Sequence, residues 1–264
     1  MARYLHPCHK KLKKRQYTQE KHYFFIQNHT YCSIIHLFCS FVRRGKAVPL
    51  QPKYLITIIM GKFIKYYALE IYSVISLIMI VCAAMIDTLS VVQKFVVVST
   101  ALFILHEWEE NSYPGGFIDI FSKALQFQAS DDLKRASRIP TSVFLIAMSV
   151  MSFVWDNMPI FTMALATFCI FEGFVHIMGI KIFKLKKFYT PGMVTAELEL
   201  VVGVGLIVYL VKNDLGAWYD YTFGPLLFVV CFMMMQKTLM MIIGIRYRDL
   251  PKIMKQNLKK LRER

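Results

Sequence analysis

The chain alternates long apolar runs with shorter connections that carry most of the charge. Each run is close to the roughly 20 residues that a helix needs to cross a bilayer, and a helix satisfies its backbone hydrogen bonds internally. We therefore predict an all-α fold, a polytopic transmembrane helical bundle of about six spans. The runs cover residues 66–86, 91–108, 139–155, 159–183, 193–211 and 222–245.

Basic residues cluster in every second connection, and this pattern predicts an orientation. Lys and Arg close to the ends of spans are retained on the cytoplasmic side of a membrane. The alternating connections hold only Lys94 and Lys212. We therefore expect both termini in the cytoplasm. The basic set comprises Lys62, Lys65, Lys123, Lys134, Arg135, Arg138, Lys181, Lys184, Lys186, Lys187 and eight further Lys or Arg residues from position 246 onward.

Composition and charge divide the chain into three parts. Hydrophobic residues make up 56% of the chain, against roughly 45–50% apolar residues in soluble domains. Residues 1–59 hold 11 of the 32 Lys and Arg but a single acidic residue, Glu20, so most of the net charge of +15 lies there. We expect a poorly patterned basic extension over residues 1–59, a six-helix membrane domain over 60–246 and a basic cytoplasmic tail over 247–264. Met60 opens directly into the first span and is a candidate for the true start.

The same charge distribution bears on partners. Positive charge in a tail and in loops between apolar runs is not the continuous basic face of a nucleic-acid-binding protein. We therefore expect membrane lipids and no nucleic acid as partners, with the oligomeric state left open. The six cysteines occur singly and form no redox or zinc motif.

Histidine and glutamate residues gather at one predicted end of spans two and four. His106, Glu109 and Glu110 are spaced i, i+3 and i+4, so they share one helix face, and so do Glu172 and His176. Both spans end on the cytoplasmic side, so the two groups should lie at similar depth. An imidazole combined with carboxylates suits a metal site or acid–base chemistry. An ionisable residue within a span marks a functional site by default.

Span five contributes a third group of candidates. It follows Tyr189-Thr-Pro191-Gly192 and contains Glu197 and Glu199 in its first two turns. Residues two apart on a helix are about 200° apart around its axis, so only one of the two carboxylates is expected to face a given pocket. We favour Glu197.

Residues 117–129 place apolar side chains at spacings of three and four. This pattern predicts an amphipathic helix at the cytoplasmic interface. Two interpretations remain open: a lid over a site, or a simple surface helix.

Three ordered motifs resemble a known family. His106-Glu-Trp-Glu109-Glu110, the isolated His176 and Tyr189-Thr-Pro191-Gly192 are similar to the motifs of bacterial HXXEE-domain membrane proteins, and Pro114-Gly-Gly after the first motif agrees. The resemblance implies an integral protein of the bacterial cytoplasmic membrane and no defined activity. Histidine-box desaturases need more histidines than this chain holds beyond residue 59. The glutamate-based intramembrane proteases place an arginine after their paired acids, in the stretch where this chain has Asn111-Ser-Tyr-Pro114.

These residues support three hypotheses about function. The first is a metal-dependent enzyme in which His106, Glu110 and His176 are ligands and Glu109 or Glu172 is the general base or a supporting residue. The metal would be zinc, iron or manganese, and the substrate a lipid or another membrane-soluble molecule at the cytoplasmic face. The second is a small proton- or cation-coupled transporter. The third is a scaffold whose polar cluster only specifies helix packing.

Overall fold

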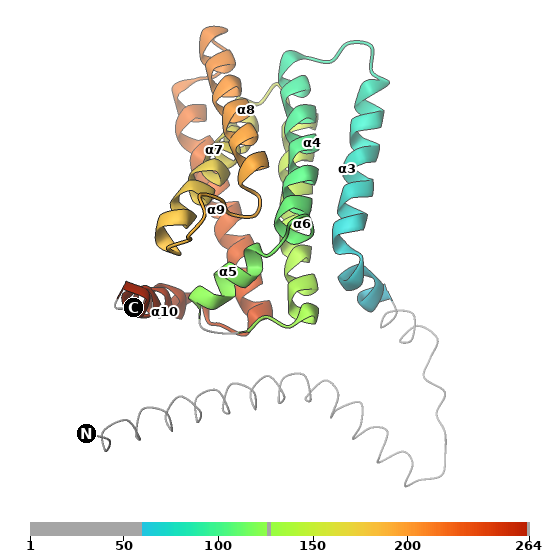
Figure 1. Ribbon diagram of the computed structural model, residues 1–264. Helices are drawn as coiled ribbons and strands as arrows, with labels where there is room; N and C mark the ends of the chain where they lie inside the picture. Colours follow the sequence, from blue (N-terminus) through green and yellow to red (C-terminus); the bar gives the residue numbers. More distant parts are fainter. Residues whose placement is uncertain (1–59, 126–127, 263–264) are drawn as a thin grey trace, which may run out of the picture. The chain divides into compact units, whose positions relative to one another are not determined.

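The computed structural model describes residues 60–125 and 128–262, and all regular secondary structure in these residues is helical (Figure 1). The predicted all-α fold is thereby confirmed, while the predicted extension over residues 1–59 lies outside the described residues. The long helices are α3 (Ala68–Ala84), α4 (Val91–Asn111), α6 (Asp131–Val154), α7 (Pro159–Ile182), α8 (Met193–Lys212) and α9 (Trp218–Ile243). The shorter ones are α5 (Phe117–Ala124), η1 (Tyr247–Asp249) and α10 (Leu250–Arg262).

The described helices fit a membrane protein of five or six spans. Five of them, α4 and α6–α9, are each long and apolar enough to cross a bilayer. The sixth candidate is α3 together with the helix Met60–Tyr66, which meets it at a bend of 79°. Side chains at Val201, Val204, Val208, Val229 and Val230 are 44–65% exposed on α8 and α9, and such a continuous apolar exterior fits contact with lipid. The orientation of the termini stays a prediction.

Local sequence signals explain where these helices begin. Ser90 forms a capping box with Gln93 at the start of α4, and the Ser130 side chain accepts from the backbone N–H of Leu133 at the start of α6. These bonds satisfy backbone donors that the first helical turn leaves unpaired. Helix α6 therefore begins at Asp131, well before the predicted residue 139, and Pro140 lies inside it.

Phenylalanine side chains fill the centre of the bundle. Helix α7 packs against α8 and α9, α4 packs against α8, α6 and α3, and α6 packs against α9. The Phe168 ring of α7 lies 5.2 Å from Phe103 of α4, 5.1 Å from Phe144 of α6 and 5.8 Å from Phe228 of α9, centroid to centroid. At these distances aromatic pairs are favourable beyond the apolar area that they bury. One residue thus joins four helices.

The bend before α3 is tied to the first turns of α6. The Arg135 guanidinium lies over the Tyr66 ring, 3.6 Å from its centroid, and Lys65 forms an ion pair with Asp132.

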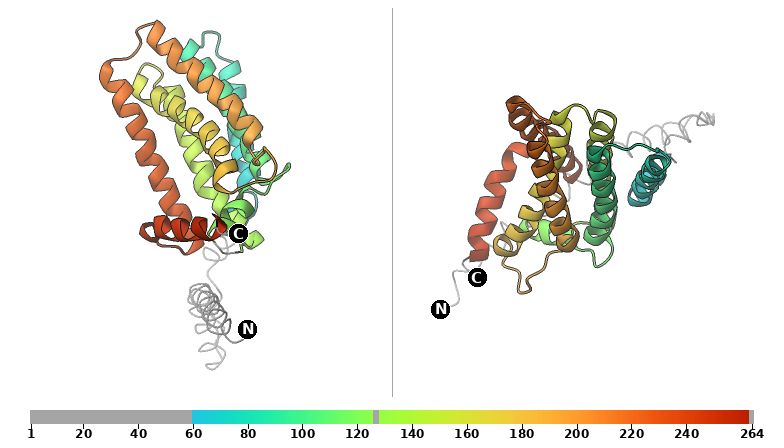
Figure 2. Two further views of the ribbon diagram at one scale, coloured as in Figure 1. Left: turned by 60° about the vertical axis from the view of Figure 1, so that its left-hand side comes forward. Right: turned by 90° about the horizontal axis from the view of Figure 1, so that it is seen from above.

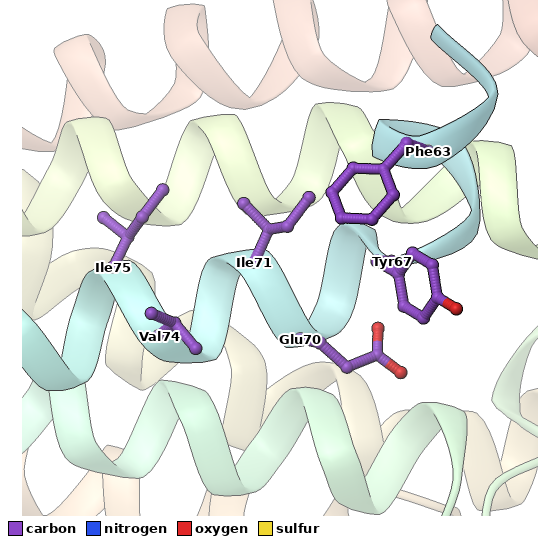
Figure 3. Close-up of a pocket in the computed structure, with 6 residues that line it drawn as sticks. All are labelled: Phe63, Tyr67, Glu70, Ile71, Val74 and Ile75. Atoms are coloured by element: carbon purple, nitrogen blue, oxygen red, sulfur yellow. The ribbon is translucent and has the colours of Figure 1, made fainter. Parts of the chain in front are cut away.

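A hollow of about 290 Å³ beside the bend is lined by α3 and the helix that precedes it. Figure 3 shows that Glu70 is the only carboxylate among its labelled residues. This hollow holds no histidine and no second acid, so it is not the predicted site.

Two short helices lie across the same end of the bundle. Figures 1 and 2 show α5 and α10 crosswise to the long helices, near the end of α9, and the two are in contact. Helix α5 ends at Ala124, so it is shorter than the predicted segment 117–129. The predicted basic tail contains a regular helix, α10, which follows directly on η1.

Candidate functional site

Four side chains from α4 and α7 converge at the end of the bundle where α5 lies. We call His106, Glu110, Glu172 and His176 the His/Glu cluster. Glu110 Oε1 lies 3.6 Å from His106 Nε2 and 3.2 Å from His176 Nε2. Glu172 Oε2 lies 3.9 Å from each of the same two nitrogens. Helix periodicity causes this arrangement, because each histidine stands four residues from a glutamate on its own helix.

The other ring nitrogen of each histidine is already engaged. His106 Nδ1 lies 3.1 Å from the Gly192 carbonyl oxygen and 3.0 Å from Thr195 Oγ1. A carbonyl oxygen only accepts, so His106 Nδ1 carries the proton. Thr190 Oγ1 lies 2.9 Å from His176 Nδ1 and donates to the His176 carbonyl oxygen at 3.5 Å, so it accepts from Nδ1–H. Both Nε2 atoms therefore present lone pairs to the carboxylates.

With both carboxyls deprotonated, no proton donor in the described residues stands between those facing atoms. His176 Nε2 is buried and, among residues 60–125 and 128–262, has no hydrogen-bond partner. Two imidazole lone pairs and two carboxylate oxygens repel one another unless a cation or extra protons lie among them. The candidate ligand atoms of His106, Glu172 and His176 all lie within 4.8 Å of one another. The arrangement is therefore one that can hold a metal ion.

The loop before α8 is built against this cluster. Gly192 has φ of +90° and is the N-cap of α8. A Cβ at this position would stand 2.6 Å from Glu110 Cγ, 2.8 Å from His176 Cε1 and 2.9 Å from His106 Cε1. Only glycine accommodates both that backbone conformation and that close approach. Pro191 and Thr190, which precede it, are also buried.

Glu109 lies beside the cluster but has a different set of contacts. Its carboxylate accepts from the Tyr189 hydroxyl at 2.8 Å, the Thr195 hydroxyl at 2.7 Å, the Thr195 N–H at 3.0 Å and the Val194 N–H at 3.3 Å. The last two are unpaired donors in the first turn of α8, where a negative charge is favourable. Glu109 thus caps α8 from α4, and its hydrogen bonds favour a positioning role over that of a free base.

Tyr189 provides a test of this cap. Partial burial, together with the adjacent Glu109 carboxylate, raises the pKa of Tyr189 to about 12. We expect Tyr189→Phe to lower the free energy of unfolding by about 1–2 kcal/mol, because a hydrogen bond to a charged acceptor is lost. The folded state holds the phenol proton more tightly than the unfolded state. The difference from wild type should therefore be complete below pH about 10, the ordinary tyrosine value, and disappear as the pH rises through about 12.

Denaturation of the detergent-solubilised chain at several pH values measures this difference. Tyr113→Phe is the matched control, because the Tyr113 side chain is exposed and stacks on Trp108 through its ring, which phenylalanine keeps. Equal effects of the two substitutions, or an effect of Tyr189→Phe that does not change with pH, would contradict the proposed cap.

Of the two glutamates in the first turns of α8, Glu199 is the one that lies close to His106. Glu199 has no exposed surface, and its Oε1 lies 4.0 Å from His106 Nδ1. Neither of its oxygens has a hydrogen-bond partner in the part of the chain that the structure describes. Glu197, the residue that the sequence favours, is partly exposed, although its Oε1 is also buried without a hydrogen-bond partner in the described residues. The choice between them depends on the rotation of α8, which is set by its packing on α7 and α4 and not by its own sequence.

Other residues at the site gave little or no signal in the sequence. Thr190 and Thr195 lie within hydrogen-bond distance of the Nδ1 atoms of His176 and His106, yet isolated threonines near a helix start usually indicate only a cap.

Phe117 of α5 packs on His176, with ring centroids 5.2 Å apart. The contact places the start of the predicted interfacial helix against the cluster, and the lid stays a prediction. About 100° around α4 from His106, Glu107 is buried and accepts from Asn111 Nδ2 at 3.1 Å.

Comparisons with known proteins agree with the motif resemblance. Residues 97–208 match the family model described as a protein of unknown function with HXXEE motif. The matched region includes the four cluster residues and the loop 189–192. Searches of curated proteins and of solved structures gave no significant match. Over residues 97–208, from within α4 to within α8, the chain therefore carries an HXXEE domain.

Proposed function

We propose that this chain is a metal-dependent membrane enzyme, with His106, Glu110 and His176 as ligands. The observation that carries the proposal is the set of lone pairs that face one another without a donor between them. Glu110 Oε1 is the oxygen closest to both Nε2 atoms, at 3.2 and 3.6 Å. In a tetrahedral site with bonds of about 2.0–2.2 Å, neighbouring ligand atoms stand about 3.3–3.6 Å apart. The observed separations are close to that spacing.

Charge supports a divalent ion. With both histidines neutral and both carboxyls deprotonated, Glu110 and Glu172 would bring two negative charges to the cluster, and their side chains are only 14% and 15% exposed. Two unpaired carboxylates at the end of a span cost several kcal/mol each. A divalent cation neutralises them. Two nitrogens and two oxygens suit zinc, and also iron or manganese.

The surrounding residues complete the proposed roles. Thr190 and the Gly192 carbonyl orient the two imidazoles through their Nδ1 atoms, as outer partners of metal-bound histidines do. Glu172 stands farther from the nitrogens than Glu110, so it is the candidate general base or a fourth ligand. A bound divalent ion would activate water or polarise a carbonyl or phosphoryl oxygen. Because the cluster lies at the end of two candidate membrane spans, α4 and α7, the proposed substrate is a lipid or another membrane-soluble molecule.

Metal analysis of the purified full chain tests this proposal. After loading with zinc, iron or manganese and desalting, we expect about one more bound ion per chain in wild type than in His106→Ala or His176→Ala. The expectation follows because removing one of three or four ligands leaves an incomplete site. Residues 1–59 contain five histidines, so the measurement is the difference between wild type and variants and not the total.

Two outcomes would refute the metal site. Either wild type and both variants hold equal amounts of every metal, or wild type retains none after desalting. If the variants instead unfold at lower temperature than wild type without any change in metal content, the cluster is a structural polar centre.

The orientation of the chain in the membrane is tested separately by a reporter fusion after Arg138, which should report a cytoplasmic location.

A further inference from the structure

Helix α10 combines a basic composition with an apolar stripe. Residues 250–262 contain five Lys or Arg and no acidic residue. Apolar residues stand at positions 250, 253, 254, 258 and 261, the spacing of one helix face. This combination is typical of helices that lie in the plane of a membrane surface and contact anionic lipids.

The placement of α10 agrees with that pattern. The left view of Figure 2 shows α10 running crosswise to α9 at the end of the bundle. Asn257 is buried and Ile253 and Met254 are half-buried, whereas Lys252 and Lys255 are exposed. Over residues 250–257 the helix therefore turns Ile253 and Met254 toward the bundle and Lys252 and Lys255 away from it, at the level where the long helices end.

Contacts lead from α10 to the His/Glu cluster. Helix α10 touches α5, and Phe117 at the start of α5 lies against His176. Helix α5 is also held to α6 by the ion pair between Asp119 and Lys134, at 2.8 Å. A change in the position of α10 would therefore alter the position of α5, whose Phe117 packs on His176.

We propose that α10 binds anionic phospholipid headgroups through Lys252 and Lys255, and that this binding holds α5 over the His/Glu cluster. Charge complementarity identifies the partner: a basic helix face meets the negative surface of a phosphatidylglycerol- or phosphatidylserine-containing leaflet. The position of α10, crosswise to α9 at the level where the candidate spans end, favours a lipid surface over a free anion, because a membrane places its headgroups at that level. The proposal is independent of whether the cluster holds a metal.

Hydrogen exchange of the full chain in nanodiscs tests the proposal. One disc contains phosphatidylcholine alone, and the other contains about one third phosphatidylglycerol, which gives an anionic surface. We expect slower backbone exchange of residues 250–262 in the anionic disc, by about fivefold for each lysine that contacts the surface. Residues 117–125 should slow in the same direction. About 0.5 M NaCl should reduce the difference, because the Debye length becomes short.

Variants separate this effect from a general influence of the lipid. The double variant Lys252→Gln/Lys255→Gln should exchange at the same rate in both discs, because it lacks the two charges. Lys212→Gln is the matched control: Lys212 is exposed at the other end of the bundle, and its variant should keep the wild-type difference. Two results would overturn the proposal: equal exchange of wild-type α10 in both discs, or an undiminished difference in the double variant. Slowing of residues 250–262 without slowing of residues 117–125 would overturn the link to the cluster.

Discussion

Replacing Gly192 with alanine is expected to weaken metal binding by at least about a hundredfold, more than the 10–100-fold that loss of one outer partner typically costs. The added Cβ would stand 2.6–2.9 Å from atoms of Glu110, His176 and His106. Three of the four cluster residues would have to move apart, and the ligand atoms are useful only at bonding distance of one ion. Metal content of the purified variant, and metal titration by calorimetry, measure the loss.

Gly116→Ala is the matched control for this experiment. Gly116 also has positive φ, +100° against +90°, and also precedes a helix as its N-cap. A Cβ there meets no atom within 4 Å. Both variants therefore bear the left-handed backbone penalty of about 1–2 kcal/mol, but only Gly192→Ala intrudes on the cluster. If both variants bind metal equally well, or equally poorly, the proposed role of Gly192 at the site is wrong.

Replacing Glu110 with glutamine is expected to remove stoichiometric metal while preserving the helical fold. Glu110 Oε1 faces both Nε2 atoms at 3.2 and 3.6 Å, and the change removes one of the two negative charges that a divalent ion neutralises. The amide can instead donate a hydrogen bond to an imidazole lone pair. We therefore expect the variant to keep or raise its thermal stability in detergent without metal, since a repulsion between lone pairs is replaced by a bond.

Glu107→Gln provides the comparison on the same helix. Glu107 is as buried as the cluster residues but accepts from Asn111, with Arg138 beyond it, and a glutamine oxygen can accept the same bond. We expect this variant to bind metal as wild type does. Retention of metal by Glu110→Gln, or parallel losses in both variants, would rule out a specific ligand role for Glu110.

Periodicity and loop charge were enough to bring His106, Glu110, Glu172 and His176 to one end of the bundle. A helix repeats every 3.6 residues, so an i, i+4 pair lies on one face wherever the helix packs. Alternating loop charges placed the ends of spans two and four on the same side. Depth and face were therefore predictable, because both depend on residues close together in the sequence.

Other features depend on packing between distant segments, and the sequence does not encode them locally. Glu199 lies beside His106 because α8 packs closely on α7 at Gly203, where a Cβ would stand 2.7 Å from the Ala166 carbonyl oxygen. The sharp bend before α3 follows from ties between Tyr66, Lys65 and the start of α6. Helix α10, in contrast, has a local signal, because its apolar residues are spaced along one helix face.

The loop Tyr189–Gly192 contacts both sides of the site at once. Thr190 orients His176 of α7, the Gly192 carbonyl orients His106 of α4, and Tyr189 holds Glu109. Four consecutive residues thus determine the direction of two imidazoles that belong to different helices. The two histidines are consequently not independent: any ligand, modification or insertion that displaces this loop will misalign both together, so the site should be assembled or dismantled as a unit.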